Sequence, residues 1–174
     1  LSAICSSQWL IDENYLQLLI SVVNGEGDRE EAMLVKEENE RARTVLQSAV
    51  AGTDVAIIPV IGPIIPRATM FSRVCGITDL DMLNSQFESA LSDDSVGKIL
   101  FYFDSPGGHA TGINEFSDKI YEARGRKPIE GYVGGTSASA SFWMSSAVDR
   151  LSVDATARLG SVGVVVAMPK SDGT

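Results

Sequence analysis

Apolar residues recur along this chain in two different patterns, and the change between them divides it into two parts. From Trp9 to Val23 they return every three or four positions, which predicts an amphipathic helix. Turn-forming residues at 24–28 interrupt this pattern. A second, solvated helix is predicted over Glu30–Val50, where charges of opposite sign lie four positions apart. Residues 1–50 are therefore expected to form a helical N-terminal extension.

Short apolar runs and helical stretches alternate from Val55 onward. The run 55–64 is continuous and rich in β-branched residues, which is typical of a strand buried on both faces. The same reasoning predicts further strands at 98–103, 128–133, 150–153 and 161–167, and helices at 79–91, 113–123 and 139–147. This alternation predicts an α/β fold with largely parallel pairing, and residues 51–174 are assigned to that core.

Composition and charge restrict the class of function. The chain has 174 residues, of which 44% are hydrophobic, enough to bury the core of one domain. Its formal net charge of -9 repels phosphate backbones and disfavours a nucleic-acid partner. The apolar stretches are too short to span a bilayer, so we expect no membrane anchor in this segment.

The residues that bind metals are few. The chain has two cysteines, Cys5 and Cys75, and a single histidine, His109. A structural zinc site needs about four nitrogen or sulfur ligands, so no metal and no other cofactor is expected. Isolated thiols are expected in preference to a disulfide. Any mechanism of the Ser–His–Asp or Cys–His type would have to use His109.

Two turns follow predicted strands and precede predicted helices. In Ser105–Gly108, Pro106 fixes the backbone and the glycines allow close approach, so N–H groups can point into a cleft. An ordinary glycine-rich turn would have the same sequence. The small residues of 134–143 either form a packing interface or leave a serine hydroxyl at a helix N-terminus. Composition does not choose among Ser137, Ser139 and Ser141.

The order of the motifs resembles that of peptidase family S49. The series runs from Val55 to Val166 and reads VAIIPVIGPI, SPGG, GGTSASASFW, DRL and LGSVGVVV. This family includes the signal peptide peptidase A enzymes and the head-maturation proteases of tailed bacteriophages, and the N-terminal region resembles the phage branch more. The resemblance implies a ClpP/crotonase-like fold of repeated ββα units and a serine nucleophile with a lysine as general base.

The resemblance also implies which serine is the nucleophile. The family has two small residues after the nucleophile, commonly glycines, followed by two aromatic residues. Phe142 and Trp143 match the aromatic positions, which assigns the nucleophile to Ser139. Ala140 and Ser141 replace the glycine pair, and both are still small.

The oxyanion hole and the base follow from the same resemblance. Gly107 or Gly108 would supply one N–H group and Ala140 the other, each typically contributing about 3 kcal/mol. By the family's spacing the lysine base is expected beyond Thr174, which would make the core incomplete at its C-terminal end. Lys170 is the only lysine after Ser139, and we expect it to lie too early, in a polar turn.

His109 is not expected to be the base. It directly follows the glycine turn, whereas the histidine of ClpP lies downstream of its serine. A substrate-contacting or solvated position at the rim of the cleft is expected instead. The apolar stripe of Leu16, Leu19, Ile20 and Val23 predicts contacts with the core or with a second subunit, and we expect a homo-oligomer.

These features predict a serine endopeptidase of the Ser–Lys type that cleaves extended protein segments. The phage branch implies scaffold or capsid proteins as substrates, in the host cytoplasm or the prohead. One alternative is signal-peptide degradation, as in signal peptide peptidase A, at a periplasmic membrane. Another is a non-catalytic assembly protein on the same fold. An acyl-CoA enzyme of the crotonase type is disfavoured because nothing in the sequence indicates binding of coenzyme A.

Overall fold

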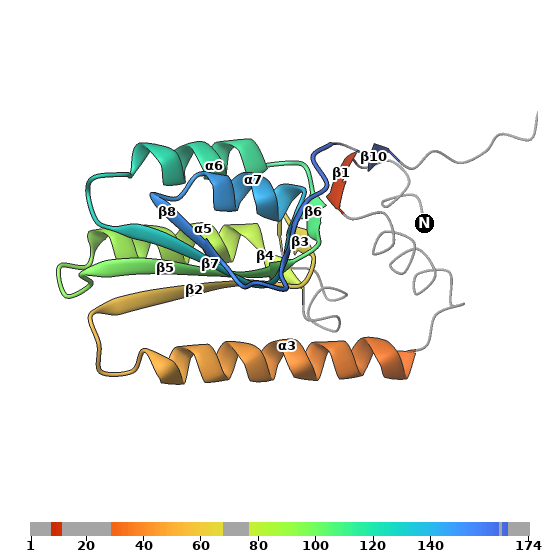
Figure 1. Ribbon diagram of the computed structural model, residues 1–174, viewed down its shortest axis with the longest axis horizontal. Helices are drawn as coiled ribbons and strands as arrows, with labels where there is room; N and C mark the ends of the chain where they lie inside the picture. Colours follow the sequence, from red (N-terminus) through yellow and green to blue (C-terminus); the bar gives the residue numbers. More distant parts are fainter. Residues whose placement is uncertain (1–7, 12–28, 68–76, 164, 167–174) are drawn as a thin grey trace, which may run out of the picture.

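The computed structural model describes residues 8–11, 29–67, 77–163 and 165–166, and within them it is an α/β structure with two sheets (Figure 1). The helices are α3 (Arg29–Ala49), α5 (Leu80–Ser92), α6 (Ile113–Glu122) and α7 (Ala140–Ser146). The main sheet has the order β2 (Val55–Ile61), β5 (Lys98–Ser105), β7 (Ile129–Ala138) and β8 (Arg150–Val153), and β9 (Arg158–Gly160) also pairs with β7. The second sheet has the order β10 (Val165–Val166), β1 (Gln8–Ile11), β6 (Gly107–His109), β3 (Ile64–Ile65) and β4 (Thr78–Asp79).

The main sheet is parallel throughout, with helices on one face and a further helix along its β2 edge. Helices α5, α6 and α7 lie above it in Figure 1, and α3 runs below it along β2. The core on the upper side is aromatic: Phe87 of α5 packs against Phe101 and Phe116, with ring centroids 5.7 and 6.0 Å away. All three side chains are buried, so this layer fixes the helices on the sheet.

Helix α3 protects an edge of the main sheet. Strand β2 pairs only with β5 among the described strands, so its outward carbonyl groups need other partners. Arg43 donates to the carbonyl oxygens of Ile61 at 2.8 Å and Pro59 at 3.4 Å, and Gln47 donates to that of Ile57 at 3.3 Å. Burial lowers the pKa of Arg43. Pro59 has no N–H group to donate to a neighbouring strand. It is tolerated here because the outer side of β2 is an edge and needs no such donor.

The second sheet lies at the carboxyl ends of the main strands. β3 and β4 follow β2 before α5 begins, and β6 follows β5 before α6 begins. Ile64 pairs with Gly108 where β3 and β6 meet. A Cβ atom on Gly108 would lie 1.9 Å from the carbonyl oxygen of Ile64, so only glycine fits there. The chain therefore changes sheets after β2 and again after β5, at the same end of the molecule.

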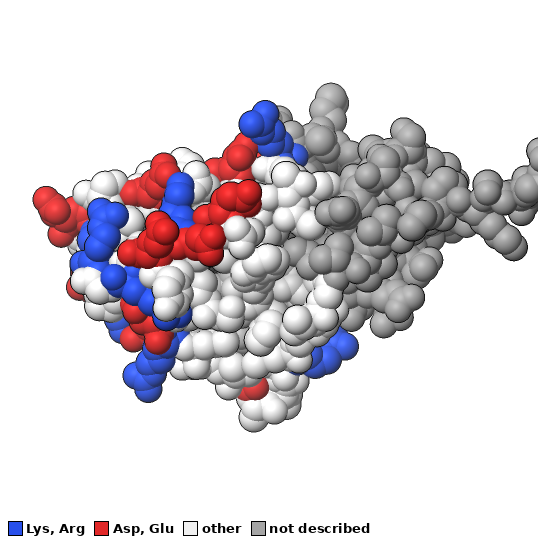
Figure 2. Space-filling model, turned by 90° about the horizontal axis from the view of Figure 1, so that it is seen from above, with Lys and Arg blue, Asp and Glu red and all other residues white. Residues whose placement is uncertain are grey.

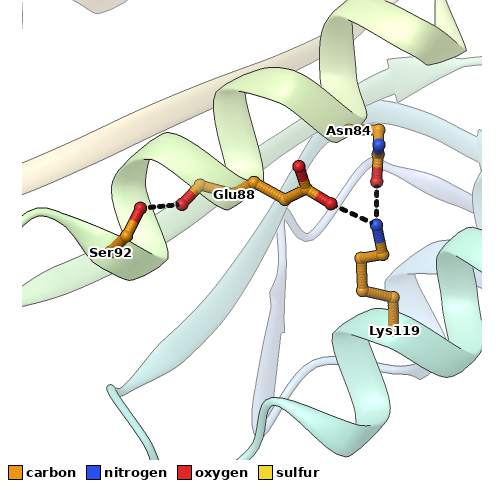
Figure 3. Close-up of polar contacts among 4 residues, drawn as sticks. All are labelled: Asn84, Glu88, Ser92 and Lys119. Atoms are coloured by element: carbon orange, nitrogen blue, oxygen red, sulfur yellow. Dashed lines mark hydrogen bonds and ion pairs between the residues drawn. The ribbon is translucent and has the colours of Figure 1, made fainter.

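A polar cluster joins α5 to α6 on the outer surface (Figure 3). Lys119 of α6 donates to Asn84 Oδ1 at 2.6 Å and forms an ion pair with Glu88. Ser92 donates to the backbone carbonyl of Glu88. The ion pair is exposed, so its contribution to stability is expected to be at most about 1 kcal/mol.

Several predicted elements are confirmed. Helices were predicted at 30–50, 79–91, 113–123 and 139–147, and α3, α5, α6 and α7 match them within two residues at each end. The strand predicted at 150–153 is β8, and 98–103 lies within β5. β7 extends five residues beyond its predicted end, into the small-residue segment. The prediction of an α/β fold with mainly parallel pairing is therefore correct.

Other predictions are wrong, and the second sheet is the main reason. The run 55–64 is not one strand, because Gly62, with a φ of 73°, ends β2 and the chain then enters β3. Residues 8–11 form β1 rather than a helix, since they pair with β6 and β10. The strand predicted at 161–167 is reduced to β10, and β9 precedes it. The two cysteines, Lys170 and the apolar stripe lie outside the described residues, and the division at residue 50 stays a prediction.

Candidate active site

Ser139 is the single residue between β7 and α7, and its backbone conformation is unusual. Its φ is 53° and its ψ is -114°, a combination that residues with a side chain rarely adopt. Holding it there costs on the order of 1–3 kcal/mol. Its N–H group donates to the carbonyl of Gly160 at 2.8 Å, and its own carbonyl accepts from Trp143 at 2.9 Å. A sharp, strained turn from strand to helix is also how α/β-hydrolases present a nucleophilic serine.

The structure separates the three serines that composition leaves equivalent. The hydroxyl groups of Ser137 and Ser141 lie 3.0 Å apart, and Ser137 also donates to Ser145 at 3.1 Å. All three of these side chains are fully buried between β7 and α7. The hydroxyl of Ser139 is outside this network and donates to the carbonyl of Gly163 at 3.2 Å. Ser139 is therefore the serine whose hydroxyl faces another segment rather than the core.

The two turns singled out in the sequence lie at the same end of adjacent parallel strands. Ser105 of β5 is the register partner of Ser137 of β7, and Gly107 and Ser139 each follow two residues later. Residues of α7 and β6 also lie within 8 Å of each other by Cα positions. Gly107 and Gly108 lie in strand β6 rather than in the predicted turn, and Pro106 alone separates β6 from β5. The fold brings this glycine segment beside the helix that begins after Ser139.

The predicted oxyanion donors differ in their surroundings. The N–H group of Gly107 donates to the hydroxyl of Ser105 at 3.2 Å, so a substrate oxygen would have to compete with that hydroxyl. Gly108 lies between β1 and β3, where it pairs with Leu10 and Ile64. Ala140 is the first residue of α7 and is fully buried. The N–H groups of a helix's first turn have no acceptor within the helix, which leaves that of Ala140 suited to bind an oxyanion.

A cavity of about 350 Å³ lies at the carboxyl ends of the main strands. Its position next to Ser139 follows from Ala138, which precedes the serine, and from Gly160, which accepts its N–H group. The complete lining is Asn39, Gly62, Asp104, Pro106, Thr136, Ala138, Arg158, Leu159, Gly160 and Ser161. Its volume is in the range typical of ligand pockets, so it can accept a side chain of a bound polypeptide.

Charged groups at this cavity are held by Thr136. Asp104 accepts the N–H group of Thr136 at 2.9 Å, and Arg158 donates weakly to its hydroxyl at 3.4 Å. Both charged side chains are exposed. Elsewhere, most Lys, Arg, Asp and Glu residues visible from above the helices gather at the end away from the second sheet (Figure 2). The cavity thus presents one carboxylate and one guanidinium group on a lining that also includes the polar residues Asn39, Thr136 and Ser161.

His109 has a defined hydrogen-bonding state. Its Nδ1 atom accepts the N–H group of Thr111 at 3.2 Å. An acceptor at Nδ1 requires the proton of the neutral ring to be on Nε2. Burial lowers the pKa of His109, which favours that neutral form. In this state Nε2 is a donor, which does not suit it to remove a proton from a serine.

The lysines that the structure describes all have other partners. Lys98 pairs with Glu130 at 3.2 Å, and Lys36 pairs with Glu40 at 3.6 Å. Lys119 binds Asn84 and Glu88 in the middle of α5, and Lys127 binds the carboxyl end of the same helix. Lys98 begins β5, whose carboxyl end lies seven residues away, or about 23 Å along the strand. Within the described part of the chain, the base that the resemblance implies is therefore not in place beside Ser139.

No group of three or more His, Cys, Asp and Glu side chains in the described ranges is arranged to hold a metal ion. In those ranges, too, no helix has both the length and the hydrophobicity to span a lipid bilayer.

Two contributions to the site were not predicted from the sequence. Gly160 and Gly163 supply the carbonyl groups that bind the N–H and the hydroxyl of Ser139. Both glycines belong to the sequence motif LGSVGVVV. The glycines themselves are its only indication that backbone carbonyl groups there contact Ser139. Asn39 of α3 also lines the cavity, although residues 1–50 are predicted only as a helical extension of the core. Its polar side chain on a charged helix gave no signal of this position.

The fold and the turn define the class as an α/β domain with a serine on a strained strand-to-helix turn. Two known proteins with similar sequences come from bacteriophages. No family model matches the chain. The chain is 34% identical over 112 residues to the head-tail preconnector protein GP5 of Enterobacteria phage P21, covering 64% of this chain and 22% of that protein. It is 33% identical over 113 residues to the capsid assembly protease C of Escherichia phage lambda, covering 65% of this chain and 26% of that protein. The chain thus spans about a quarter of the length of these curated relatives.

Proposed function

We propose that this chain is the nucleophile-bearing part of a serine endopeptidase that acts in the maturation of phage or prophage heads. The observation that carries the proposal is the turn at Ser139, where the one non-core hydroxyl of three candidate serines lies at the start of a helix. The similarity to a capsid assembly protease and a head-tail preconnector protein supports the setting. The order of motifs supports membership of peptidase family S49.

The proposed chemistry begins with attack by the hydroxyl oxygen of Ser139 on a peptide carbonyl. A base removes the hydroxyl proton, and the carbonyl oxygen becomes an oxyanion. The N–H group of Ala140 and one from Gly107 or Gly108 stabilise that charge, at about 3 kcal/mol for each donor. Protonation of the amine releases the first product and leaves an acyl group on Ser139, which water then hydrolyses.

The base is proposed to be a lysine, as in family S49, placed by the spacing of that family after Thr174. Burial would lower its pKa and make it a proton acceptor near neutral pH. The proposed fold is of the ClpP/crotonase type. Two successions of a main strand, second-sheet strands and a helix, β2–β3–β4–α5 and β5–β6–α6, support this assignment.

The proposed substrates are extended segments of scaffold or capsid proteins inside the host cell or the prohead. An extended segment presents its side chains one by one, and the 350 Å³ cavity beside Ser139 suits one such side chain. We further propose that the protein works as a homo-oligomer, which would limit access to the site to flexible segments.

The test compares Ser139→Ala with Ser146→Ala in the full-length gene product. Ser146 is exposed on the same helix and donates only to the carbonyl of Trp143, so its variant is a matched control. Purified protein is incubated with the scaffold and capsid proteins of the same phage and with casein, and cleavage is followed by mass spectrometry. We expect Ser146→Ala to cleave normally and Ser139→Ala to lose at least about 10³-fold in rate. Equal cleavage by both variants would contradict the proposal and favour an assembly role.

A further inference from the structure

We infer that Arg124 is a positioning residue for Ser139, acting through helix α7. The effect on catalysis rests on the proposed function, whereas the effect of Arg124 on the backbone at Ser139 can be measured separately. Arg124 lies just after α6, in the turn that leads to β7, and it is distant in sequence from every residue of the candidate site.

The guanidinium group of Arg124 binds the carboxyl end of α7. Nε donates to the carbonyl of Ala147 at 2.8 Å, and Nη2 donates to that of Ser146 at 3.3 Å and to that of Val148. The last carbonyl groups of a helix have no donors within it, and a cation there also complements the helix dipole. The ring of Tyr121 lies 4.3 Å from the guanidinium carbon and limits its movement.

Helix α7 is short enough to transmit this restraint to its other end. Its seven residues span about 10 Å, and Ser139 immediately precedes them. The N-terminal end lacks a side-chain cap, so the position of Ser139 depends on the helix behind it as well as on the bonds to Gly160 and Gly163. A residue with this positive φ keeps its conformation only when the surrounding contacts determine it. A shift of about 1 Å at a reacting group can reduce a rate about 10²-fold.

Lys127 provides a matched control in the same turn. Its Nζ atom donates to the carbonyl of Ala90 at 2.9 Å and to that of Asp93, so it caps the carboxyl end of α5. Both residues are therefore cations that follow α6 and cap a neighbouring helix. Helix α5 provides no residue of the candidate site, so a loss of stability alone affects both variants, and an effect on Ser139 is specific to Arg124.

The experiment compares Arg124→Met with Lys127→Met, which remove the cation and keep an aliphatic chain. Amide hydrogen exchange is measured at the N–H groups of Ser139 and Trp143, which report on the turn, and at the end of α5. We expect Arg124→Met to speed exchange at Ser139 and Trp143 at least about tenfold, and Lys127→Met to speed it only at the end of α5. Unchanged exchange at the turn in Arg124→Met, or an equal change in both variants, would overturn the inference.

Steady-state kinetics of the full-length gene product test whether Arg124 also affects catalysis by Ser139. We expect Arg124→Met to lower kcat about 10-fold to 100-fold with KM within twofold of wild type, and added methylguanidinium to restore part of it. Lys127→Met is expected to keep the wild-type kcat. An unchanged kcat in Arg124→Met would contradict a role in positioning Ser139 for catalysis. An inactive wild type would contradict the proposed function, whereas the exchange measurement would still decide whether Arg124 fixes the turn.

Discussion

At the scale of single residues, the backbone of Ser139 distinguishes it from its neighbours. The sequence segment 134–143 offers three serines with similar surroundings, and only the resemblance favoured Ser139. In the structure, two of the three belong to a buried hydroxyl network, and Ser139 has a φ of 53°. No local propensity predicts such a value for serine, because it results from the packing of β7, α7 and the segment after β9.

The strain at Ser139 gives a prediction about stability. Glycine adopts a positive φ without the steric cost of a Cβ atom, so Ser139→Gly should be more stable than Ser139→Ala by about 1 kcal/mol. Urea unfolding followed by circular dichroism measures the difference. Both variants lack the hydroxyl, so the comparison isolates the backbone. A more stable Ser139→Ala would show that the turn is not strained.

His109 gives a prediction about pH. Burial lowers its pKa in the folded protein, so the unfolded chain binds its proton more readily as pH falls below about 6.5. The stability attributable to neutral His109 is therefore complete above that pH and is lost as the pH falls toward the folded pKa. We expect His109→Asn to show a smaller loss of unfolding free energy between pH 7 and pH 5 than wild type. The same slope in both proteins would contradict this account.

At the scale of elements, α3 is a structural cover for the sheet edge as well as a charged helix. Arg43 binds two carbonyls of β2, whereas Arg41, two positions away on α3, is exposed. Arg43 also donates to the Thr78 hydroxyl at 2.8 Å, and that hydroxyl donates to the carbonyl of Ile61. Removing Arg43 therefore takes a donor from the carbonyl of Pro59 and from Thr78 while Ile61 keeps its bond from Thr78, at a cost of about 2 kcal/mol. We expect Arg43→Met to lower the free energy of unfolding by that amount and Arg41→Met to lower it by less than about 0.5 kcal/mol. Similar values for both variants would show that the edge contacts contribute little.

Periodicity predicted the long elements well because each buries one face against the same core. Leu80, Leu83 and Phe87 of α5 are buried at the expected helical spacing, and the alternation in β5 is regular. The elements of the second sheet have two to four residues, and their pairing is between segments distant in sequence. A window of local sequence contains no information about such partners, so β1, β3, β4 and β6 were misassigned or missed. The glycine turn and the serine turn were found because each follows a long, readable strand.

At the scale of the whole molecule, α3 connects the N-terminal part of the chain to the site. It covers β2 along one side and contributes Asn39 to the cavity. Deleting residues 1–50 would therefore expose the unpaired edge of β2, and exposed edges promote association between chains. We expect the shortened protein to form larger and less uniform species by light scattering than the intact chain. A uniform shortened protein of unchanged stability would instead show that residues 51–174 fold without this cover.

The central claim is that Ser139 is the nucleophile, and covalent labelling tests it most directly. The full-length gene product is treated with a fluorophosphonate, which phosphonylates activated serines, and the modified residue is located by peptide mass spectrometry. The account predicts a single modification on Ser139, absent in Ser139→Ala and present in Ser146→Ala. Modification of Ser137, Ser141 or Ser161 instead, or a Ser139→Ala protein that still reacts at the wild-type rate, would contradict it.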